Sequence, residues 1–356
     1  MSINTVLLKG NEALAEGSIQ AGCRFFFGYP ITPQNEIPEY MARRMPEVGG
    51  VFLQSESEVA AINMVFGASA CGARAMTSSS SPGISLKQEG ISFLAGAQLP
   101  AVIVNVQRGG PGLGNISASQ ADYFQAVKGG GHGDYHMLVY APASVQEAYD
   151  LAVKAFDKAD EYRTPVMILA DGILGQMMEP VRLKVPKLKK FDKGWALTGC
   201  EGREPNVVKS LFMGEGELER MDLLLNKKYI RMKNRETMAE EFMVDDAELI
   251  VTAYGTAARI AKSAVRQMRS AGKKVGLIRP ITLFPFPEKV YQNAASRAKK
   301  FLTVEMNLGQ MVEDVRLAVN GKRPVEFYGR PGGGVPTPGE LYKVIAKHYP
   351  KGRKKT

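Results

Sequence analysis

Three short motifs in the first third of the chain carry the side chains best suited to chemistry. The first covers residues 28–33, with the sequence GYPITP. The second covers residues 54–61, QSESEVAA, and places Glu58 between a short apolar strand and an Ala-rich helix. The third covers residues 108–114, RGGPGLG, and begins with Arg108. One acid and one guanidinium, each at a junction between elements, predict a ligand cleft at one edge of an α/β sheet.

Glu58 has two interpretations that the local sequence leaves open. A carboxylate at a helix N-terminus can protrude into a cleft and act on a ligand there. Ser55 and Glu58 also have the spacing of a capping box, in which the Glu58 side chain would bond only the backbone of the cap. Glu56 competes with Glu58 for any catalytic role.

Arg108 follows the apolar run AVIVNV at residues 101–106. At the carboxyl end of a buried strand, its side chain would point into the ligand crevice. The fork of donors on a guanidinium suits a carboxylate or a phosphate. The alternative is a surface arginine that closes a loop.

Two further polar segments could contribute to the same cleft. Thr32 lies between Pro30 and Pro33, which restrict the backbone and would fix the Thr32 hydroxyl. Residues 78–83, SSSSPG, could form a nest of backbone N–H groups for an anion. Ordinary turns without a ligand are the alternative for both segments.

The elements that must position these motifs alternate between strand and helix over residues 1–182. Apolar runs predict strands at residues 24–27, 51–53, 75–78, 101–106 and 166–169. Helical patterns cover residues 11–21, 34–44 and 57–70, and a capping box at residues 144–147 predicts another helix. Such alternation predicts an α/β domain, with a doubly wound parallel sheet and helices on both faces.

The rest of the chain divides into a connecting segment and a second domain. Residues 183–245 break the alternation, with a linker at 186–190 and a charged helix over 215–241 that is expected to pack over one domain or against a partner. Residues 246–356 resume it and end in a basic tail. Four expected strands, at residues 249–253, 274–278, 301–305 and 325–328, predict a second, smaller doubly wound α/β domain.

Length and composition narrow the class of protein. The 356 residues, 45% of them apolar, are enough for two domains with separate cores. No apolar run approaches the ~20 residues that span a bilayer, and the N-terminus does not resemble a signal peptide. We therefore expect a cytoplasmic protein that does not bind a membrane. The net charge of +10 could attract a nucleic acid, but the basic residues are not interleaved with the aromatic residues that nucleic-acid-binding proteins use. An acidic protein partner fits the charge better.

Cysteines and histidines argue against a metal centre held by this chain. Cys23, Cys71 and Cys200 lie far apart and form no CxxC pair, which predicts neither a disulfide framework nor an iron–sulfur or zinc site. His132 and His136 lie in a glycine-rich stretch and are expected to be loop residues.

Taken in order, several motifs resemble the α subunit of 2-oxoacid:ferredoxin oxidoreductases. They are GYPITP at 28–33, QSESE at 54–58, TSSSSPG at 77–83, RGGP at 108–111 and ADG at 170–172. The second half is similar in layout, with AYG at 253–255 and RPITLFP at 279–285.

The resemblance implies a thiamine diphosphate enzyme that converts a 2-oxoacid and CoA to CO2, an acyl-CoA and reduced ferredoxin. Residues 1–182 would be the pyrimidine-binding domain, and residues 246–356 would resemble the transketolase C-terminal domain. Glu58 matches the family glutamate that bonds N1′ of the aminopyrimidine. Thr32 and Arg108 match residues that hold the substrate carboxylate. Further cofactor contacts are implied for Tyr29, Pro30, Ile31 and Ser81.

The resemblance also implies what other chains must supply. The pyrophosphate of thiamine diphosphate needs Mg2+, usually held by a Gly-Asp-Gly motif and a later Asn, and Asp171-Gly172 has no suitably placed Asn. No metal site is therefore expected here. Mg2+ and [4Fe-4S] clusters are expected in a β subunit and other partners. A γ subunit and a ferredoxin-like subunit would complete a dimerised hetero-oligomer.

The substrate is predicted from residues 108–134, which look most like the branched-chain (2-oxoisovalerate) enzymes. The 2-oxoglutarate enzymes tend to have an Arg where this chain has Gly131. Without that cation a second substrate carboxylate would be buried unpaired, which is costly. A 2-oxoglutarate enzyme whose β subunit supplies the cation is one alternative. A non-catalytic scaffold or nucleotide-binding subunit of an electron-transfer complex is another, and the missing dinucleotide fingerprint speaks against nucleotide binding.

Overall fold

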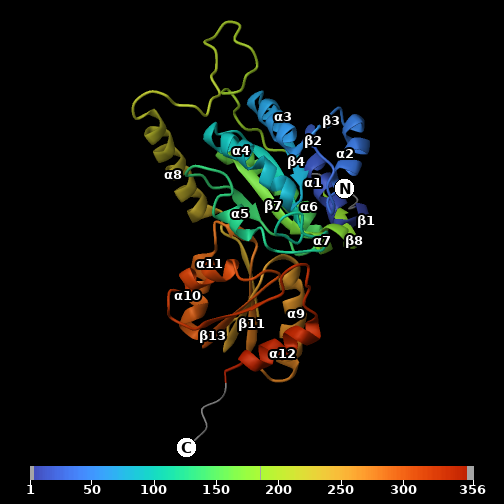
Figure 1. Ribbon diagram of the computed structural model, residues 1–356, viewed down its shortest axis with the longest axis vertical. Helices are drawn as coiled ribbons and strands as arrows, with labels where there is room; N and C mark the ends of the chain where they lie inside the picture. The colour runs from blue at the N-terminus through green and yellow to red at the C-terminus, as the bar shows by residue number, and fades with distance from the viewer. Residues whose placement is uncertain (1–3, 185, 351–356) are drawn as a thin grey trace, which may run out of the picture.

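The structure is a computed structural model that describes residues 4–184 and 186–350 (Figure 1). Its larger sheet has the strand order β12-β6-β7-β5-β4-β2-β3. All of these strands are parallel except β12, which runs antiparallel to β6. Every residue of β5 and β7 is buried, as expected for strands that are covered on both faces. The strands are β2 (Phe25–Gly28), β3 (Val51–Gln54), β4 (Ala75–Ser79), β5 (Ala101–Gln107), β6 (Leu138–Tyr140), β7 (Pro165–Asp171) and β12 (Thr282–Phe284).

Helices cover both faces of this sheet. One group packs α1 (Gly10–Gln20) against α2 (Glu36–Glu47) and α6 (Val145–Tyr162), and the other packs α3 (Glu58–Ala70) against α4 (Ser81–Gly96). Helices α4 and α6 both contact β5 from opposite sides (Figure 1). Two short helices, α5 (Tyr123–Val127) and α7 (Gly172–Gln176), follow β5 and β7, and a separate antiparallel pair joins β1 (Asn4–Lys9) to β8 (Met178–Leu183).

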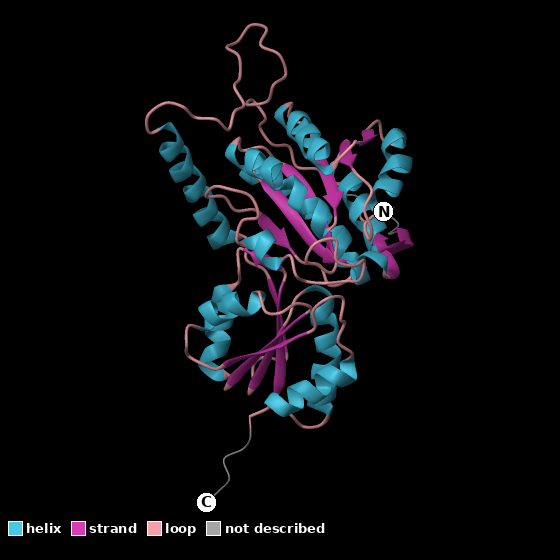
Figure 2. Cartoon of the chain, in the orientation of Figure 1, coloured by secondary structure: helices cyan, strands magenta, loops and turns pink. Residues whose placement is uncertain are grey.

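The second sheet has the order β14-β13-β10-β11-β9, again parallel except for one antiparallel edge strand, β9. Helices α9 and α12 pack together on this sheet, and α10 packs with α11 (Figure 2). The predicted class of two doubly wound α/β domains is confirmed. The elements are β9 (Ala239–Phe242), β10 (Leu249–Thr252), α9 (Gly255–Ser270), β11 (Val275–Pro280), α10 (Glu288–Arg297), β13 (Lys300–Glu305), α11 (Met311–Val319), β14 (Val325–Gly329) and α12 (Pro338–His348).

Each sheet takes one edge strand from beyond the boundary predicted at residue 246. Strand β9 lies in the predicted linker, residues 183–245, yet it pairs with β11 of the second sheet. Strand β12 lies in the predicted second domain, yet it pairs with β6 of the first sheet. Strands of three or four residues carry too little pattern for a sequence to show which sheet they join.

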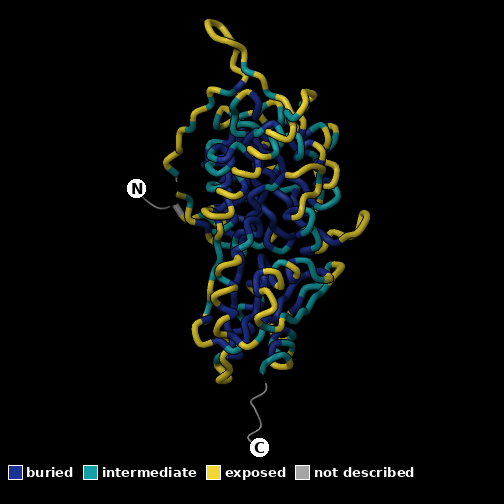
Figure 3. Tube along the Cα trace, turned by 90° about the vertical axis from the view of Figure 1, so that its left-hand side faces the viewer, coloured by how far each residue is buried: buried dark blue, intermediate teal, exposed yellow. Residues whose placement is uncertain are grey.

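The connecting segment consists of a long loop followed by α8 (Glu217–Arg235). The loop projects beyond the first domain and is exposed over most of its length (Figure 3). Helix α8 buries Leu225, Tyr229 and Met232, and Lys228 on it donates to the Arg163 carbonyl at 2.9 Å. It therefore packs over the first domain, which is one of the two predicted alternatives. Within the described residues no helix is both long and apolar enough to cross a membrane. Residues 351–356 of the basic tail lie outside the described residues.

Candidate functional site

The predicted motifs gather at the carboxyl edge of the larger sheet. Residues 29–33 follow β2, residues 55–58 follow β3, residues 80–83 follow β4, and residues 108–114 follow β5. These four strands are neighbours and parallel, so their carboxyl ends lie side by side. In open α/β sheets this edge is where ligands bind.

Glu58 is the first residue of α3, and it does not cap the helix. Ser57 is the N-cap, and its Oγ accepts a hydrogen bond of 3.2 Å from the backbone N–H of Ala60. The Ser55 hydroxyl lies instead against the carbonyls of Gly28 (3.0 Å) and Ser57 (2.8 Å). The capping-box interpretation of Ser55 and Glu58 is therefore wrong.

The Glu58 side chain is nonetheless buried, with 6% of its surface exposed. It forms no hydrogen bond with any residue that the structure describes. A helix N-terminus favours the ionised form of a carboxylate because the backbone N–H groups point toward it. Glu58 is thus held in place but keeps its hydrogen-bonding capacity for a ligand.

The first turn of α4 forms the wall against which Glu58 lies. A Cβ added to Gly83 would stand only 2.5 Å from Glu58 Oε1 and 2.1 Å from Ser79 Oγ, so only glycine allows this approach. The hydroxyls of Ser79 and Ser80 are buried and have no partner among the described residues. Unpartnered buried donors beside a free carboxylate are what a site for a polar ring requires.

Arg108 and Thr32, the two predicted substrate residues, are brought together. Arg108 is 9% exposed; its Nη1 donates to the Thr32 carbonyl at 3.0 Å and its Nη2 donates to the Leu113 carbonyl at 3.0 Å. Its Nε is buried without a partner in the described part of the chain. The Thr32 side chain is exposed at the edge of the site. The guanidinium is therefore fixed by carbonyls and keeps N–H donors for an anion.

Ser81, predicted as a cofactor contact, is already used within the chain. Its Oγ accepts the N–H of Arg108 at 3.0 Å and donates to Asp122 Oδ2 at 2.6 Å. Asn105 donates to the same Asp122 oxygen at 2.9 Å. Burial raises the pKa of Asp122, although the bonds from Ser81 and Asn105 act in the opposite direction. Ser81 thus anchors the Arg108 loop, and a direct cofactor contact stays a prediction.

Asp122 and Asn105 were not foreseen by the sequence analysis. Asn105 is a polar residue in the otherwise apolar run 101–106, and this interruption is the signal that could have identified it.

The remaining predicted contacts line the rim of the site. Tyr29 and Ile31 are half-buried and Pro30 is exposed. The Tyr29 carbonyl accepts from the Gln34 amide at 3.3 Å, and the Gln34 amide oxygen accepts from Ser78. This turn is therefore tied to the end of β4, close to the wall that carries Ser79.

Lys87 was also missed, and it is the one fully buried lysine among the described residues. It lies on α4 one turn after Gly83, and its Nζ donates to the Ser78 carbonyl at 3.4 Å. Burial lowers the pKa of Lys87 to about 8, while the negative charge of Glu58 opposes this shift. No local pattern identifies it, because a lysine in a helix is usually solvated.

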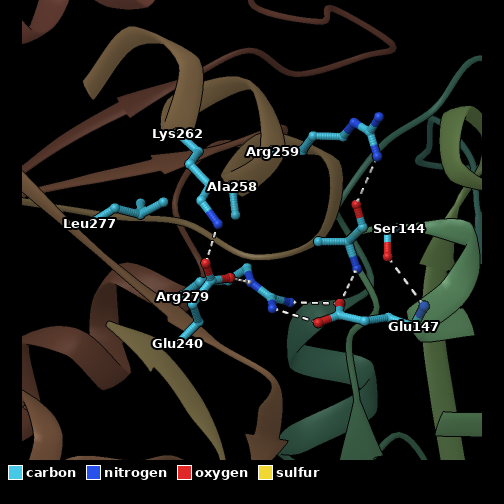
Figure 4. A pocket seen from close by; sticks show the side chains of 9 residues that line it. Ser144, Glu147, Glu240, Ala258, Arg259, Lys262, Leu277 and Arg279 are labelled. Carbon is cyan, nitrogen blue, oxygen red and sulfur yellow. Dashed lines mark hydrogen bonds and ion pairs between the residues drawn. The ribbon is translucent and has the colours of Figure 1, made fainter. Parts of the chain in front are cut away.

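Two cavities lie elsewhere in the molecule. One, of about 260 Å3, lies between the domains, where Arg279 forms two bonds with Glu147 (2.7 and 2.9 Å) and one with Glu240 (2.8 Å) (Figure 4). Its charged groups are paired with one another, so this cavity is a domain junction. The other, of about 610 Å3, lies near His136 and Phe284, whose rings stack at 4.2 Å. Neither is lined by residues of the four motifs at the carboxyl edge of the larger sheet.

Metal-ligating side chains do not converge in the described part of the chain. No three His, Cys, Asp or Glu residues there are placed to hold an ion together.

Comparison with known proteins relates this architecture to one group. Residues 16–240 match the family "Pyruvate flavodoxin/ferredoxin oxidoreductase, thiamine diP-bdg", and residues 247–341 match "Pyruvate:ferredoxin oxidoreductase core domain II". The ketoisovalerate oxidoreductase subunit VorB of Methanothermobacter thermautotrophicus is 53% identical over 96% of this chain and 97% of its own length. The 2-oxoglutarate synthase subunit KorA of the same organism is 40% identical over 96% of this chain and 98% of its own.

Solved structures agree with the sequence relatives. A 2-oxoglutarate:ferredoxin oxidoreductase from Magnetococcus marinus, with 2-oxoglutarate, coenzyme A and succinyl-CoA bound, has a TM-score of 0.85 and 27% identity. The match covers 97% of this chain and 65% of that one. A split-gene transketolase, with a TM-score of 0.60 at 14% identity, matches 96% of this chain and 97% of its own and shares the fold alone.

Proposed function

The chain belongs to the 2-oxoacid:ferredoxin oxidoreductase family as an α-type subunit, and we propose that it catalyses the oxidative decarboxylation of a branched-chain 2-oxoacid with partner subunits. The observation that supports the proposal is Glu58, a buried carboxylate that does not cap its helix and lies near the unpartnered hydroxyl of Ser79. It lies within the segment that matches the thiamine diphosphate-binding family.

The residues present fit the aminopyrimidine half of thiamine diphosphate. When bound, the cofactor supplies the electron sink that decarboxylation of a 2-oxoacid requires. Glu58 would hold a proton at ring atom N1′. The free hydroxyls of Ser79 and Ser80 would bond polar ring atoms, and the turn at residues 29–31 would contact the ring from the rim.

Arg108 and Thr32 would orient the substrate carboxylate. Arg108 is held rigidly by two carbonyls, so little side-chain entropy is lost when it binds an anion. The exposed Thr32 hydroxyl would add a neutral donor beside it. Positioning of this kind lowers the barrier by fixing the reacting carbon before chemistry begins.

Partner subunits complete the proposed enzyme. A β subunit would bind the pyrophosphate with Mg2+, and partner chains would carry the [4Fe-4S] clusters that pass electrons to ferredoxin. A γ subunit, a ferredoxin-like subunit and CoA complete the proposal, and a cytoplasmic location remains a prediction.

Two observations support the proposed branched-chain substrate, the identity to related subunits and the packing around Gly131. The ketoisovalerate subunits are 53% and 54% identical to this chain, against 38–40% for the archaeal 2-oxoglutarate subunits. A Cβ at Gly131 would stand 2.6 Å from the Gln88 carbonyl, so the backbone packing leaves no room there for an arginine. A second substrate carboxylate would therefore find no cation at this position.

The test is Glu58→Gln in the co-expressed complex, assayed by viologen reduction. We expect kcat to fall at least about 100-fold, with subunit assembly and iron content unchanged. Glu56→Gln, at an exposed position two residues earlier, is the matched control and should keep its activity. Wild-type activity in the Glu58→Gln variant would contradict the catalytic role and favour the alternative of a non-catalytic scaffold subunit. Faster turnover of 2-oxoglutarate than of 2-oxoisovalerate by the wild type would reject the substrate.

A further inference from the structure

Lys87 is a buried charge that the proposed reaction does not yet use. Its side chain is 0% exposed, and its three N–H donors have a single hydrogen-bond acceptor among the described residues, the Ser78 carbonyl at 3.4 Å. An ammonium in an apolar interior is costly unless it is paired. A methionine of similar length would fill the same space without this cost. The charge itself therefore calls for an explanation.

The position of Lys87 on α4 places it in the contact with α3. Gly83, Lys87 and Gly90 are spaced four and three residues apart, so they lie on one face of the helix. A Cβ at Gly83 would meet Glu58 Oε1 at 2.5 Å, and a Cβ at Gly90 would meet the Ile62 side chain at 2.5 Å. The two glycines thus mark the α3–α4 contact, and Lys87 lies between them.

The side chain of Lys87 is directed toward the Glu58 end of this contact. Long side chains on a helix lean toward its N-terminus, and the bond to Ser78, at the end of β4, shows that Lys87 does so. On α3, Glu58 and Ile62 are one turn apart and contact the two glycines in the same order. The ammonium is therefore buried at the end of β4, on the side of the helix contact that carries Glu58.

We propose that Lys87 is a positioning residue for Glu58, whose carboxylate it holds against the first turn of α4 by charge attraction. The inference rests on the proposed function, because it assigns Lys87 to the same reaction. Lys87 itself need not touch the cofactor or the substrate. Its ammonium favours the one orientation in which Glu58 faces the ligand.

The charges around Lys87 make the idea testable by pH. Burial lowers the pKa of Lys87, and Glu58, from α3, is the charged group in the described structure that opposes this shift. Asp122 is bound to Ser81 and Asn105, Arg108 is bound to carbonyls, and Glu89 on α4 is exposed. With a folded-state pKa of about 8, Lys87 is charged at neutral pH and loses its proton as the pH rises through that value.

The activity experiment compares the wild-type complex with Lys87→Met between pH 6.5 and 9.5. We expect kcat of the wild type to decline across about pH 8, and kcat of Lys87→Met to be about tenfold lower at pH 7 and flat across that range. The KM for the 2-oxoacid should not change. Lys227→Met, at an exposed lysine on α8, is the control and should match the wild type. A Lys87→Met complex with wild-type kcat and pH profile would overturn the proposal.

A second readout does not depend on activity. Because the folded-state pKa of Lys87 lies below its unfolded value of 10.5, the burial penalty is complete below about pH 8 and fades between there and pH 10.5. Glu58→Gln removes the charge that supports the proton, so the rise in the Tm of the complex with pH should begin at a lower pH than in the wild type. An unchanged onset refutes the charge attraction between Glu58 and Lys87, even if Lys87→Met fails to assemble. Full activity of Glu58→Gln would instead refute the proposed function.

Discussion

Substituting Gly83 with alanine tests the placement of Glu58 without removing its carboxylate. The added methyl group would lie 2.5 Å from Glu58 Oε1 and 2.1 Å from Ser79 Oγ. Both neighbours are buried, so neither can turn away into solvent. The substitution therefore changes where the acid lies and leaves its chemistry intact.

The size of the effect follows from these contacts. Cβ atoms rarely approach another heavy atom within 3.0–3.4 Å, so the Glu58 oxygen must retreat by about 0.5–0.9 Å. A misplacement of about 1 Å at a reacting centre costs about 100-fold in rate. Overpacking at a buried site should also lower the free energy of unfolding by about 1–3 kcal/mol.

The assay is viologen reduction by the assembled complex, together with thermal unfolding. Gly67→Ala is a matched control, because it is the same substitution on α3 at a glycine with no atom within 4 Å of the added Cβ. It should keep wild-type kcat and gain up to about 1 kcal/mol from helix propensity. If Gly83→Ala turned over 2-oxoisovalerate at the wild-type rate, the argument that Glu58 must lie against α4 would be refuted.

Three further outcomes are expected. Ser57→Ala should destabilise the complex by about 1 kcal/mol in denaturant titrations because α3 loses its N-cap bond, and an unchanged midpoint would show that this bond does not stabilise the helix. Arg279→Met should cost about 2 kcal/mol by the same measurement, because Glu147 loses its ion pair across the domain junction, whereas Glu240 keeps Lys262; an unchanged midpoint would contradict this. Thiol labelling followed by mass spectrometry of the isolated chain should modify Cys71 and Cys200 rapidly and spare Cys23, which is buried and whose pKa is raised to about 12 by burial; equal rates would be the contrary result.

Most of the fold could be predicted because its strands are buried on both faces. The run at residues 101–106 appears as β5 (Ala101–Gln107), and the run at residues 166–169 appears as β7 (Pro165–Asp171). A continuous apolar run bounded by turns carries this information locally. The exchanged edge strands β9 and β12 could not be predicted, because their place depends on which sheet offers a free edge after the domains have packed.

Some residues of the site could be predicted from local sequence, and others depend on tertiary packing. The convergence of Thr32 and Arg108 follows from the strand order, because Thr32 follows β2 and Arg108 follows β5, and only β4 lies between these parallel strands. Lys87 and Asp122 do not follow from it. A charged side chain in a helix or a loop carries no mark of burial, and only tertiary packing makes Lys87 buried and Asp122 half-buried. Charged residues that become buried are therefore the functional residues that are hardest to predict from a sequence.

The position of the N-cap of α3 decides whether Glu58 has a structural or a chemical role. If Ser55 were the N-cap, Glu58 would occupy the third helical position and its carboxylate would reach back to the cap backbone. With Ser57 as the cap, Glu58 is the first helical residue, and the N–H of Ala60 is satisfied by the serine. The acid keeps the favourable field of the helix N-terminus without spending its oxygens on the backbone. A carboxyl group in that situation is oriented and has its oxygens free for a ligand, and these are the properties that the proposed reaction requires of it.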